Sequence, residues 1–355
     1  MGKGGLGQKV LGYRLRDKKA FKEFKMTWFK RLTGIDEESP DQVRRELSVD
    51  GNCIVTPIGK RLAFGRLETP KLSELRQTVV DLNAEPRPSR IREVVGDVRH
   101  LHADPANAGA MFQVASQFNL LEMTGPSVTP ERGVGIYEND PTQGPACAIA
   151  CGAGTIYRHY FADVEGQVGQ SADKQIDCSA DLGAKLGNTD QRLWKMQNGY
   201  LFPSDEGLVE ISEAIRSADE AARYAMLGHL RIGLQLDAEV TLDGASHRVS
   251  QAYCSALPVA YGRQPTDQWT DFAKLVLDAA YEATLAAAVL NGARTGNRIV
   301  YLTLLGGGVF GNRDHWITDA IERAFQIHQG YDLDVRLVSY RYSNSAISGL
   351  IDRIG

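Results

Sequence analysis

A glycine-rich turn near the C-terminus has the residue types of a phosphate-binding site. The apolar run IVYLTLL enters the turn LGGGVFGN, residues 305–312, and the helical pattern DHWITDAIERAF follows. Glycines between a strand and a helix leave backbone N–H groups uncovered, and the helix N-terminus adds about half a positive charge. The turn lacks the Lys-Ser/Thr pair of a P-loop, and the alternative to a phosphate cradle is a plain tight turn. The predicted phosphate contacts are Gly306, Gly307, Gly308, Val309, Phe310 and Gly311.

A long loop, residues 119–145, is the second candidate ligand-binding segment. It follows the strand pattern AMFQVASQF, and loops of more than about 12 to 15 residues in a compact domain are usually functional or disordered. Asn119, at the strand end, has the amide donor and acceptor that recognition of sugar hydroxyls requires. Gly133 and Gly135 fit positions where backbone approaches a ligand. The alternative is a surface loop with a structural asparagine.

An acid follows a third predicted strand. Asp97, after REVVG, can accept a hydrogen bond from the exocyclic amine of a nucleobase, and its alternative role is a turn residue or a helix N-cap. The histidines of HLH at 100–102 and the five cysteines, which form no CxxC pair, lack the spacing of a metal site. The sequence therefore predicts neither a metal nor a cofactor.

The elements that position these segments alternate between short apolar strands and longer helical patterns from residue 91 onward. This alternation predicts an α/β fold, with a hairpin around 57–60 and a helix over 72–84 ahead of it. The predicted strands are 91–97, 110–118, 247–259, 297–305 and 333–340, and the predicted helices are 142–161, 207–228, 269–292 and 314–330.

Charge is distributed unevenly along the chain. The 355 residues have a formal net charge of −4, but residues 1–32 hold ten Lys/Arg and two acids. A basic arm of this kind could bind nucleic acid or an acidic partner, and the alternative is a solvated helix docked on the body. We expect a basic, mostly helical extension over 1–48 and one domain over 49–355. No apolar segment approaches the ~18 residues of a membrane span, so we expect a soluble cytoplasmic protein with no membrane partner.

Three elements in sequence order resemble those of a macrodomain. They are Gly96-Asp97-Val98 after a strand, Phe118-Asn119 at the end of the next, and LGGGVFGN near the C-terminus. The long glycine-containing loop leading into a helix is similar to the poly(ADP-ribose) glycohydrolase branch of that superfamily, and ETPKLSELR and QAYCSALPVAY resemble an uncharacterised macrodomain-like set. The resemblance covers residues 49–344. It implies a macrodomain-like mixed central sheet with helices on both faces, and ADP-ribose as the ligand.

The resemblance also implies roles for individual residues. Asp97 would hold the adenine amine, and the glycine-rich turn would wrap the diphosphate. Asn119 and the glycines of the long loop would contact the distal ribose. Tyr340 or Tyr342 would stack on adenine, the alternative for both being an amphipathic residue at the sheet edge. Phe310 would pack against the distal ribose or only plug its own loop.

The chain departs from the glycohydrolase pattern at the catalytic acid. In that branch a glycine loop is followed by Gln-Glu-Glu, whose last acid protonates the leaving oxygen, and here the corresponding residues are Gln143-Gly144-Pro145. Gln143 matches and would orient the distal ribose, but the catalytic glutamate has no match. Cleavage of a glycosidic bond needs an acid, and Glu138 and Asp140 of the same loop are the candidates. The alternative for both is a solvated loop acid or a helix N-cap.

We therefore expect a chain that binds ADP-ribose or ADP-ribosylated groups and hydrolyses the ADP-ribosyl glycosidic linkage. Two alternatives stay open. One is a non-catalytic ADP-ribose reader, which the missing Gln-Glu-Glu favours, and the other is an α/β protein for another nucleotide or phosphorylated metabolite. The candidate catalytic residues are Asn119, Glu138, Asp140 and Gln143.

Overall fold

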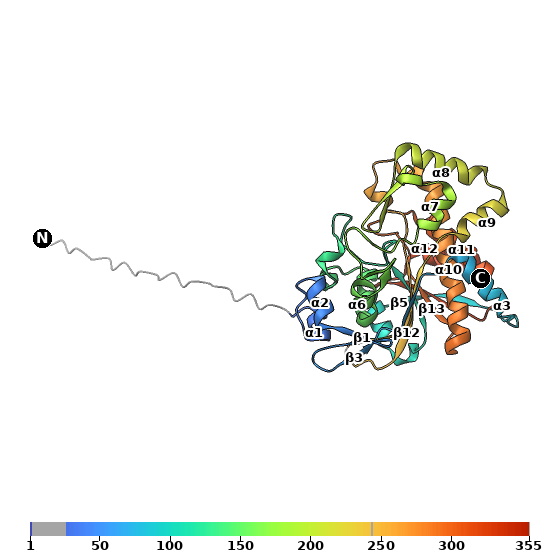
Figure 1. The fold of residues 1–355 in the computed structure, drawn as a ribbon. Coiled ribbons are helices and arrows are strands. Elements are labelled where there is room, and N and C mark those ends of the chain that lie inside the picture. The colour runs from blue at the N-terminus through green and yellow to red at the C-terminus, as the bar shows by residue number, and fades with distance from the viewer. Residues whose placement is uncertain (2–25, 243, 355) are drawn as a thin grey trace.

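A seven-stranded mixed sheet forms the centre of the molecule (Figure 1). The computed structural model describes residues 1, 26–242 and 244–354. In the strand order β4-β11-β12-β6-β13-β14-β5, the five strands from β12 to β5 are parallel, and β11 is antiparallel to both of its neighbours. The predicted α/β class is thereby confirmed. The strands are β4 Arg66–Glu68, β5 Arg90–Val95, β6 Met111–Ala115, β11 Gly233–Glu239, β12 Arg248–Cys254, β13 Ile299–Leu302 and β14 Asp334–Ser339.

Helices cover both faces of this sheet, as expected. Neighbouring residues of a strand point to opposite faces, and in β6 the side chain of Gln113 bonds to Thr284 of α10 whereas Phe112 stacks on His102 of α4. The long helix α10, Thr270–Thr295, therefore lies on one face and α4, Val98–Ala103, on the other. The remaining helices are α1 Trp28–Thr33, α2 Pro40–Glu46, α3 Leu72–Asp81, α5 Gln143–Ala150, α6 Gly152–Tyr160, α7 Ala180–Leu186, α8 Asp205–Ser217, α9 Glu220–Gly228, α11 Asp314–His328 and α12 Ser345–Ile354.

Smaller elements surround the central sheet. The predicted hairpin around 57–60 joins β2 to β3 within a three-stranded sheet, and a second hairpin pairs β9 with β10. Two short 3-10 turns, η2 Pro130–Arg132 and η3 Gly135–Asn139, lie within the long loop. The strands are β1 Ser48–Asp50, β2 Cys53–Val55, β3 Arg61–Ala63, β7 Asp163–Val164, β8 Gln167–Val168, β9 Trp194–Gln197 and β10 Tyr200–Pro203.

Two predicted helices are each divided in the structure. Residues 142–161 form α5 and α6 because Cys151, between them, has φ −117° and ψ 59°, outside the helical region. Residues 207–228 form α8 and α9 because Asp219 starts a new helix, accepting a hydrogen bond from the N–H of Ala222 at 2.8 Å. The sequence patterns predict neither β11 nor α12. In β11 a bulge, with Asp237 at φ 56°, shifts the pairing register with β12 between Gln235 and Ala238.

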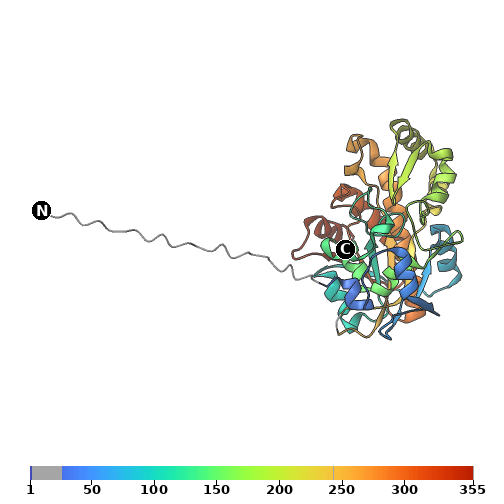
Figure 2. The same ribbon diagram turned by 60° about the vertical axis from the view of Figure 1, so that its left-hand side comes forward.

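The described part of the N-terminal extension is packed on the body. Helices α1 and α2 contribute to a second hydrophobic core that also contains residues of the long loop. Figures 1 and 2 show both helices lying against the globular part. Residues 2–25 of the predicted basic arm lie outside the described residues, and the predicted boundary at residue 48 stays a prediction. The residues that the extension contributes to this core include Trp28, Phe29, Ile35, Val43 and Leu47.

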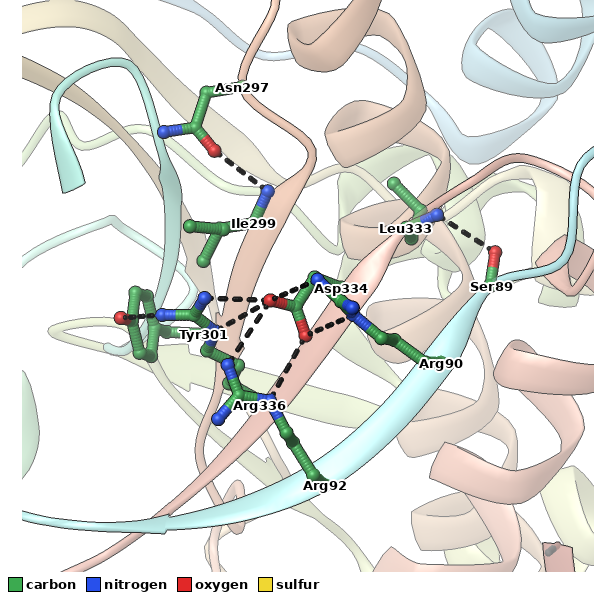
Figure 3. Close-up of polar contacts among 9 residues, drawn as sticks. All are labelled: Ser89, Arg90, Arg92, Asn297, Ile299, Tyr301, Leu333, Asp334 and Arg336. Carbon is green, nitrogen blue, oxygen red and sulfur yellow. Dashed lines mark hydrogen bonds and ion pairs between the residues drawn. The ribbon is translucent and has the colours of Figure 1, made fainter. Parts of the chain in front are cut away.

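A buried carboxylate anchors the edge strand that Asp97 follows (Figure 3). Asp334 begins β14 and lies opposite Arg90 of β5. Its carboxylate accepts hydrogen bonds from Arg336 at 2.7 and 3.0 Å and from Arg92 of β5 at 3.2 Å. Burial raises the pKa of Asp334, but the hydrogen bonds from Arg92 and Arg336 outweigh it and lower the pKa to about 2. Charge-assisted bonds from two strands therefore hold β5 in register.

None of the helices in 26–242 and 244–354 combines the length and apolar character of a membrane span. Over these ranges, no three His, Cys, Asp or Glu side chains come together as metal ligands.

Candidate functional site

A cavity of about 360 Å³ lies at the carboxyl ends of three adjacent parallel strands. Ala115 ends β6, Cys254 ends β12 and Thr303 follows β13, and all three residues line the cavity. The carboxyl edge of a parallel sheet is where open α/β folds bind ligands. The other walls come from the long loop with the start of α5, from the glycine-rich turn, and from aromatic side chains. The two segments with the strongest sequence patterns therefore meet at one cavity.

Glu122 places an acid in this cavity. The residue is 2% exposed and lines the cavity, and neither of its carboxyl oxygens has a hydrogen-bond partner in the described part of the chain. Burial raises the pKa of Glu122 to about 8; Arg158 acts against this rise and Asp140 adds to it. A carboxyl group with this pKa is largely protonated at neutral pH and can donate its proton to a bound substrate.

A compact turn after β6 holds the backbone of Glu122. The side chain of Gln117 bonds Met123 twice: Nε2 donates to its carbonyl at 3.2 Å, and Oε1 accepts from its N–H at 2.9 Å. Leu120 has φ 63°, in the left-handed region, and reverses the chain between them. The N–H of Glu122 donates to the hydroxyl of Tyr137 at 3.0 Å. The turn is thus fixed on both sides of the acid.

A buried arginine accompanies this acid. Arg158 of α6 is fully buried, with its guanidinium 3.6 Å from the ring centroid of Tyr253, and it donates to the carbonyl of Leu120 at 3.2 Å. No ion pair joins Arg158 to Glu122 among the described residues. Its positive charge favours the carboxylate form of Glu122, whereas burial favours the protonated form. Because burial and the charge of Arg158 act in opposite directions on its pKa, Glu122 can change between its protonated and ionised forms.

Gln143 and Gly144 join the start of α5 to the end of β6. The Oε1 of Gln143 accepts from the N–H of Ala115 at 3.0 Å, and its Nε2 donates to the carbonyl of Gln113 at 2.8 Å. A Cβ on Gly144 would lie 2.0 Å from the carbonyl oxygen of Ala115 and 3.1 Å from Cγ of Glu122. Gln143 lines the cavity, but strand backbone already occupies both ends of its amide. The side chain of Glu122 lies beside Gly144, which is the residue that follows Gln143.

Glycine is required at one end of the glycine-rich turn. Gly306 has φ 70°, and a Cβ there would lie 2.5 Å from Nδ2 of Asn312 and 2.6 Å from Cβ of Ala256. The Nδ2 of Asn312 also donates to the carbonyl of Leu257 at 2.8 Å. Side chain and backbone together therefore hold the turn in a fixed shape.

The turn presents uncovered donors. Four of its N–H groups donate to no acceptor in the described part of the chain, those of Gly306, Gly308, Val309 and Phe310, and all four residues line the cavity. Gly307 does not line the cavity, and its N–H bonds to the carbonyl of Leu304 at 3.2 Å. Uncovered N–H groups ahead of a helix N-terminus favour an anion.

Aromatic side chains form one wall of the cavity. Tyr200, Tyr261 and Phe310 come from three separate segments, and their ring centroids are 5.4 to 5.7 Å apart. Phe310 therefore both packs within the protein and faces the cavity, so its two predicted roles are compatible. Flat aromatic faces of this kind suit the apolar face of a sugar ring.

Several predicted site residues lie away from the cavity, because other parts of the chain occupy them. Asn119 is buried, its Nδ2 donates to Gln175 at 2.8 Å, and its Oδ1 accepts from the N–H of Leu121. Glu138 accepts from the N–H of Trp28 at 3.1 Å. The glycines at 133 and 135 approach a carboxylate of the N-terminal extension. Of the four candidate catalytic residues, Asp140 and Gln143 line the cavity.

Asp97 and Tyr340 lie further along the same carboxyl edge, after β5 and β14. Asp97 caps α4 by accepting from the N–H of Arg99 at 2.9 Å, and it also pairs with the guanidinium of Arg99 at 2.7 Å. The N-cap role is thus present, and the carboxylate keeps further acceptor sites. Tyr340 is exposed, with the guanidinium of Arg341 4.9 Å from its ring centroid.

The sequence patterns do not identify Glu122, although a signal is present. Glu122 is the single acid in the run LLEM, directly after a buried strand. An acid flanked by apolar residues that pack inward has to be buried, and buried acids are rare unless they are paired or functional.

Comparison with known proteins gives structural matches only. No protein-family model matches the sequence, and no curated protein sequence matches it. Among solved structures, a poly(ADP-ribose) glycohydrolase from Thermomonospora curvata has 14% identity and a TM-score of 0.45, with 89% of this chain and 96% of that chain covered. Another, from Deinococcus radiodurans in complex with ADP-ribose, has 11% identity and a TM-score of 0.41, covering 81% of this chain and 92% of that one. Because the TM-scores are below 0.5, this likeness establishes neither family membership nor activity.

Proposed function

We propose that the protein binds ADP-ribose or an ADP-ribosylated group in this cavity and hydrolyses the ADP-ribosyl glycosidic bond. The observation that carries the proposal is the buried, unpartnered carboxyl group of Glu122 in the same cavity as four uncovered N–H groups. A proton donor and an anion cradle are the two features that hydrolysis of a diphosphate-linked sugar requires. The sequence resemblance supplies the identity of the sugar nucleotide.

The proposed chemistry uses two carboxyl groups. Protonated Glu122 donates its proton to the leaving oxygen while the bond from that oxygen to the anomeric carbon of the ribose breaks. Asp140, the other carboxyl group of the cavity, stabilises the positive charge that develops on the sugar. A water molecule then adds to the anomeric carbon and gives a proton to Asp140. The products are ADP-ribose and the acceptor with its proton, and proton return to Glu122 through solvent restores the site.

The proposed ligand would lie along the carboxyl edge of the sheet. The diphosphate would accept hydrogen bonds from the glycine-rich turn, and the distal ribose would face the aromatic wall and Glu122. The nucleoside would extend toward Asp97 and Tyr340, where the resemblance places adenine. A base stacked on an exposed aromatic ring contributes about 1 to 3 kcal/mol.

Direct assay of the purified chain tests the proposal. We expect free ADP-ribose to appear when the chain is incubated with an ADP-ribosylated protein or oligonucleotide, and calorimetric titration with ADP-ribose to show binding. Binding of ADP-ribose without its release from either substrate would mean that the protein is a non-catalytic reader and not a hydrolase. Absence of both would indicate a different nucleotide or phosphorylated ligand.

A methyl group at Gly308 is expected to block the ligand without disturbing the fold. Gly308 lines the cavity, and a Cβ added there meets no protein atom within 4 Å. Gly308→Ala should therefore keep its thermal unfolding midpoint, while its affinity for ADP-ribose falls about tenfold or more because the methyl group occupies the diphosphate position. Gly349→Ala, in α12 and also without a neighbour within 4 Å, is the control that should bind normally. Unchanged affinity of Gly308→Ala would move the diphosphate away from this turn.

A further inference from the structure

The carboxylate of Glu37, in the loop between α1 and α2, is enclosed by three donors. Its Oε1 accepts from the N–H of Val134 at 2.8 Å and from the hydroxyl of Tyr160 at 2.6 Å, and its Oε2 accepts from the N–H of Gly135 at 2.6 Å. A Cβ at Gly133 or Gly135 would lie within 2.7 Å of this carboxylate. The backbone at the two glycines that the sequence singles out thus lies against an anion, and that anion is the Glu37 carboxylate of the same chain.

The short turn η3 extends from this carboxylate to the cavity. Gly135 begins it beside Glu37, and Tyr137 in its middle accepts the hydrogen bond from the N–H of Glu122 at 3.0 Å. Asp140 follows the turn, donates its N–H to the carbonyl of Tyr137 at 3.1 Å and lines the cavity. One turn of five residues therefore contacts both carboxyl residues of the cavity. A turn this short has little stability of its own, so its geometry depends on what holds it.

A second attachment from the same extension holds η3. The backbone N–H of Trp28 donates to Glu138, within the turn, at 3.1 Å, and its indole N–H donates to the carbonyl of Val134 at 3.0 Å. Trp28 also belongs to the buried core that contains Leu121 and Met123, the two neighbours of Glu122. Side-chain packing and hydrogen bonds of the extension thus converge on the segments that carry the proposed acid.

We infer that Glu37 is a positioning residue, which together with Trp28 makes residues 26–47 a clamp that places both Glu122 and Asp140. The inference rests on the proposed function, since that function gives the two carboxyl groups their roles. Glu37 does not line the cavity and acts only through η3. Release of the clamp loosens both carboxyl groups together, which a substitution of either one cannot do.

The clamp also influences the titration of Glu122. When η3 loosens, water reaches Glu122 and Asp140 moves away from it, and both changes favour the ionised form. Arg158 is held separately from η3, because its guanidinium donates to the carbonyl of Leu120 and to the side chains of Gln235 and Thr155. The titratable and charged groups that face Glu122 are Asp140, Tyr137, Arg158, Cys147 and Tyr253.

Kinetics of Glu37→Gln test the clamp. The amide places an N–H₂ group against backbone N–H donors, so at least one bond of the nest is lost. We expect kcat to fall about tenfold or more with KM changed less than about threefold, and the alkaline limb of the pH–rate profile to move to lower pH by about one unit. Asp36→Asn is the matched control, because Asp36 lies in the same loop, is exposed, and within the described part of the chain its side chain pairs only with Lys30.

A direct titration separates this inference from the proposed function. The infrared band of the protonated Glu122 carboxyl, assigned by its loss in Glu122→Gln, should titrate at lower pH in Glu37→Gln than in the unmodified chain. Such a shift in a protein that hydrolyses nothing would support the clamp and reject the hydrolase. Equal midpoints in the two proteins would overturn the clamp, whatever the activity.

A milder variant keeps the test decisive if Glu37→Gln does not fold. Tyr160→Phe removes one of the three donors and leaves the two backbone bonds to Glu37. We expect the same direction of shift with a smaller size, together with faster amide hydrogen exchange at residues 134–140. A folded Tyr160→Phe with neither change would also overturn the clamp.

Discussion

Glu122→Gln is expected to lower the rate of ADP-ribose release by about 10² to 10⁴, while ADP-ribose still binds. The amide has the size of the carboxyl group but cannot donate an acidic proton to the leaving oxygen. Release assays and calorimetric titration of the same preparation measure the two effects. Glu131→Gln is the matched control, since Glu131 lies in the same long loop and bonds the N–H of Ala172 away from the cavity. Full activity of Glu122→Gln would reject Glu122 as the acid.

The same substitution is expected to stabilise the protein at alkaline pH. Burial raises the pKa of Glu122 from 4.5 to about 8, so between these values the folded chain holds a proton that the unfolded chain has released. The free energy of unfolding contributed by this group is therefore highest below about pH 4.5 and falls as the pH rises to about 8. Glutamine has no such proton. Thermal unfolding at pH 5 and pH 8.5 measures this effect. The unfolding midpoint of Glu122→Gln, relative to that of the unmodified chain, should be higher at pH 8.5 than at pH 5. A relative midpoint that is lower at pH 8.5 would mean that Glu122 is ionised in the folded protein.

Gly144→Ala is expected to destabilise the protein by on the order of 3 kcal/mol or more. The new Cβ would lie 2.0 Å from the carbonyl oxygen of Ala115, so the start of α5 has to move away from β6. That movement stretches the two hydrogen bonds by which Gln143 holds the strand. Thermal and denaturant unfolding measure the loss, and hydrolysis should fall with it because Glu122 loses its packing partner.

Another glycine calibrates the effect of this change. Gly349 lies in α12 with no neighbour within 4 Å of an added Cβ, so Gly349→Ala should stabilise the chain by about 0.5 to 1 kcal/mol. A Gly144→Ala protein with an unchanged midpoint would mean that α5 does not approach β6 as closely as described.

Most of the central fold is predictable from local pattern. The parallel strands β5, β6, β12, β13 and β14 each contain an apolar run bounded by turn residues, and the long apolar helix α10 has no competing interpretation. Patterns fail where the backbone departs from regular geometry, as at Cys151, where the apolar helical pattern continues on both sides of the break. β11 is a different case: its residues 234–239 alternate between apolar and polar, and what the sequence does not reveal is the bulge at Asp237 that shifts its register with β12.

The candidate site is only partly predictable, because its acid depends on contacts across the chain. The glycine-rich turn can be identified from local sequence, since a cluster of glycines directly indicates a tight turn with exposed backbone. Asn119, in contrast, has the right chemistry at a strand end but is occupied by Gln175. The unusual property of Glu122 is its burial beside Arg158 and Gly144, which belong to other segments of the chain. No rule of sequence spacing brings these three residues together.

The contact between Gly144 and Glu122 bears on how relatives of this chain can be found. The acid stands beside the position that follows Gln143, but it is supplied by a different segment of the chain. A linear pattern that demands the two acids of Gln-Glu-Glu directly after the glutamine discards such a chain. A three-dimensional template that asks for one carboxyl group next to that position, from either side, retains it. Chains with a small residue after the glutamine and an isolated acid just after the central strand should therefore be assayed for hydrolysis before they are classed as readers.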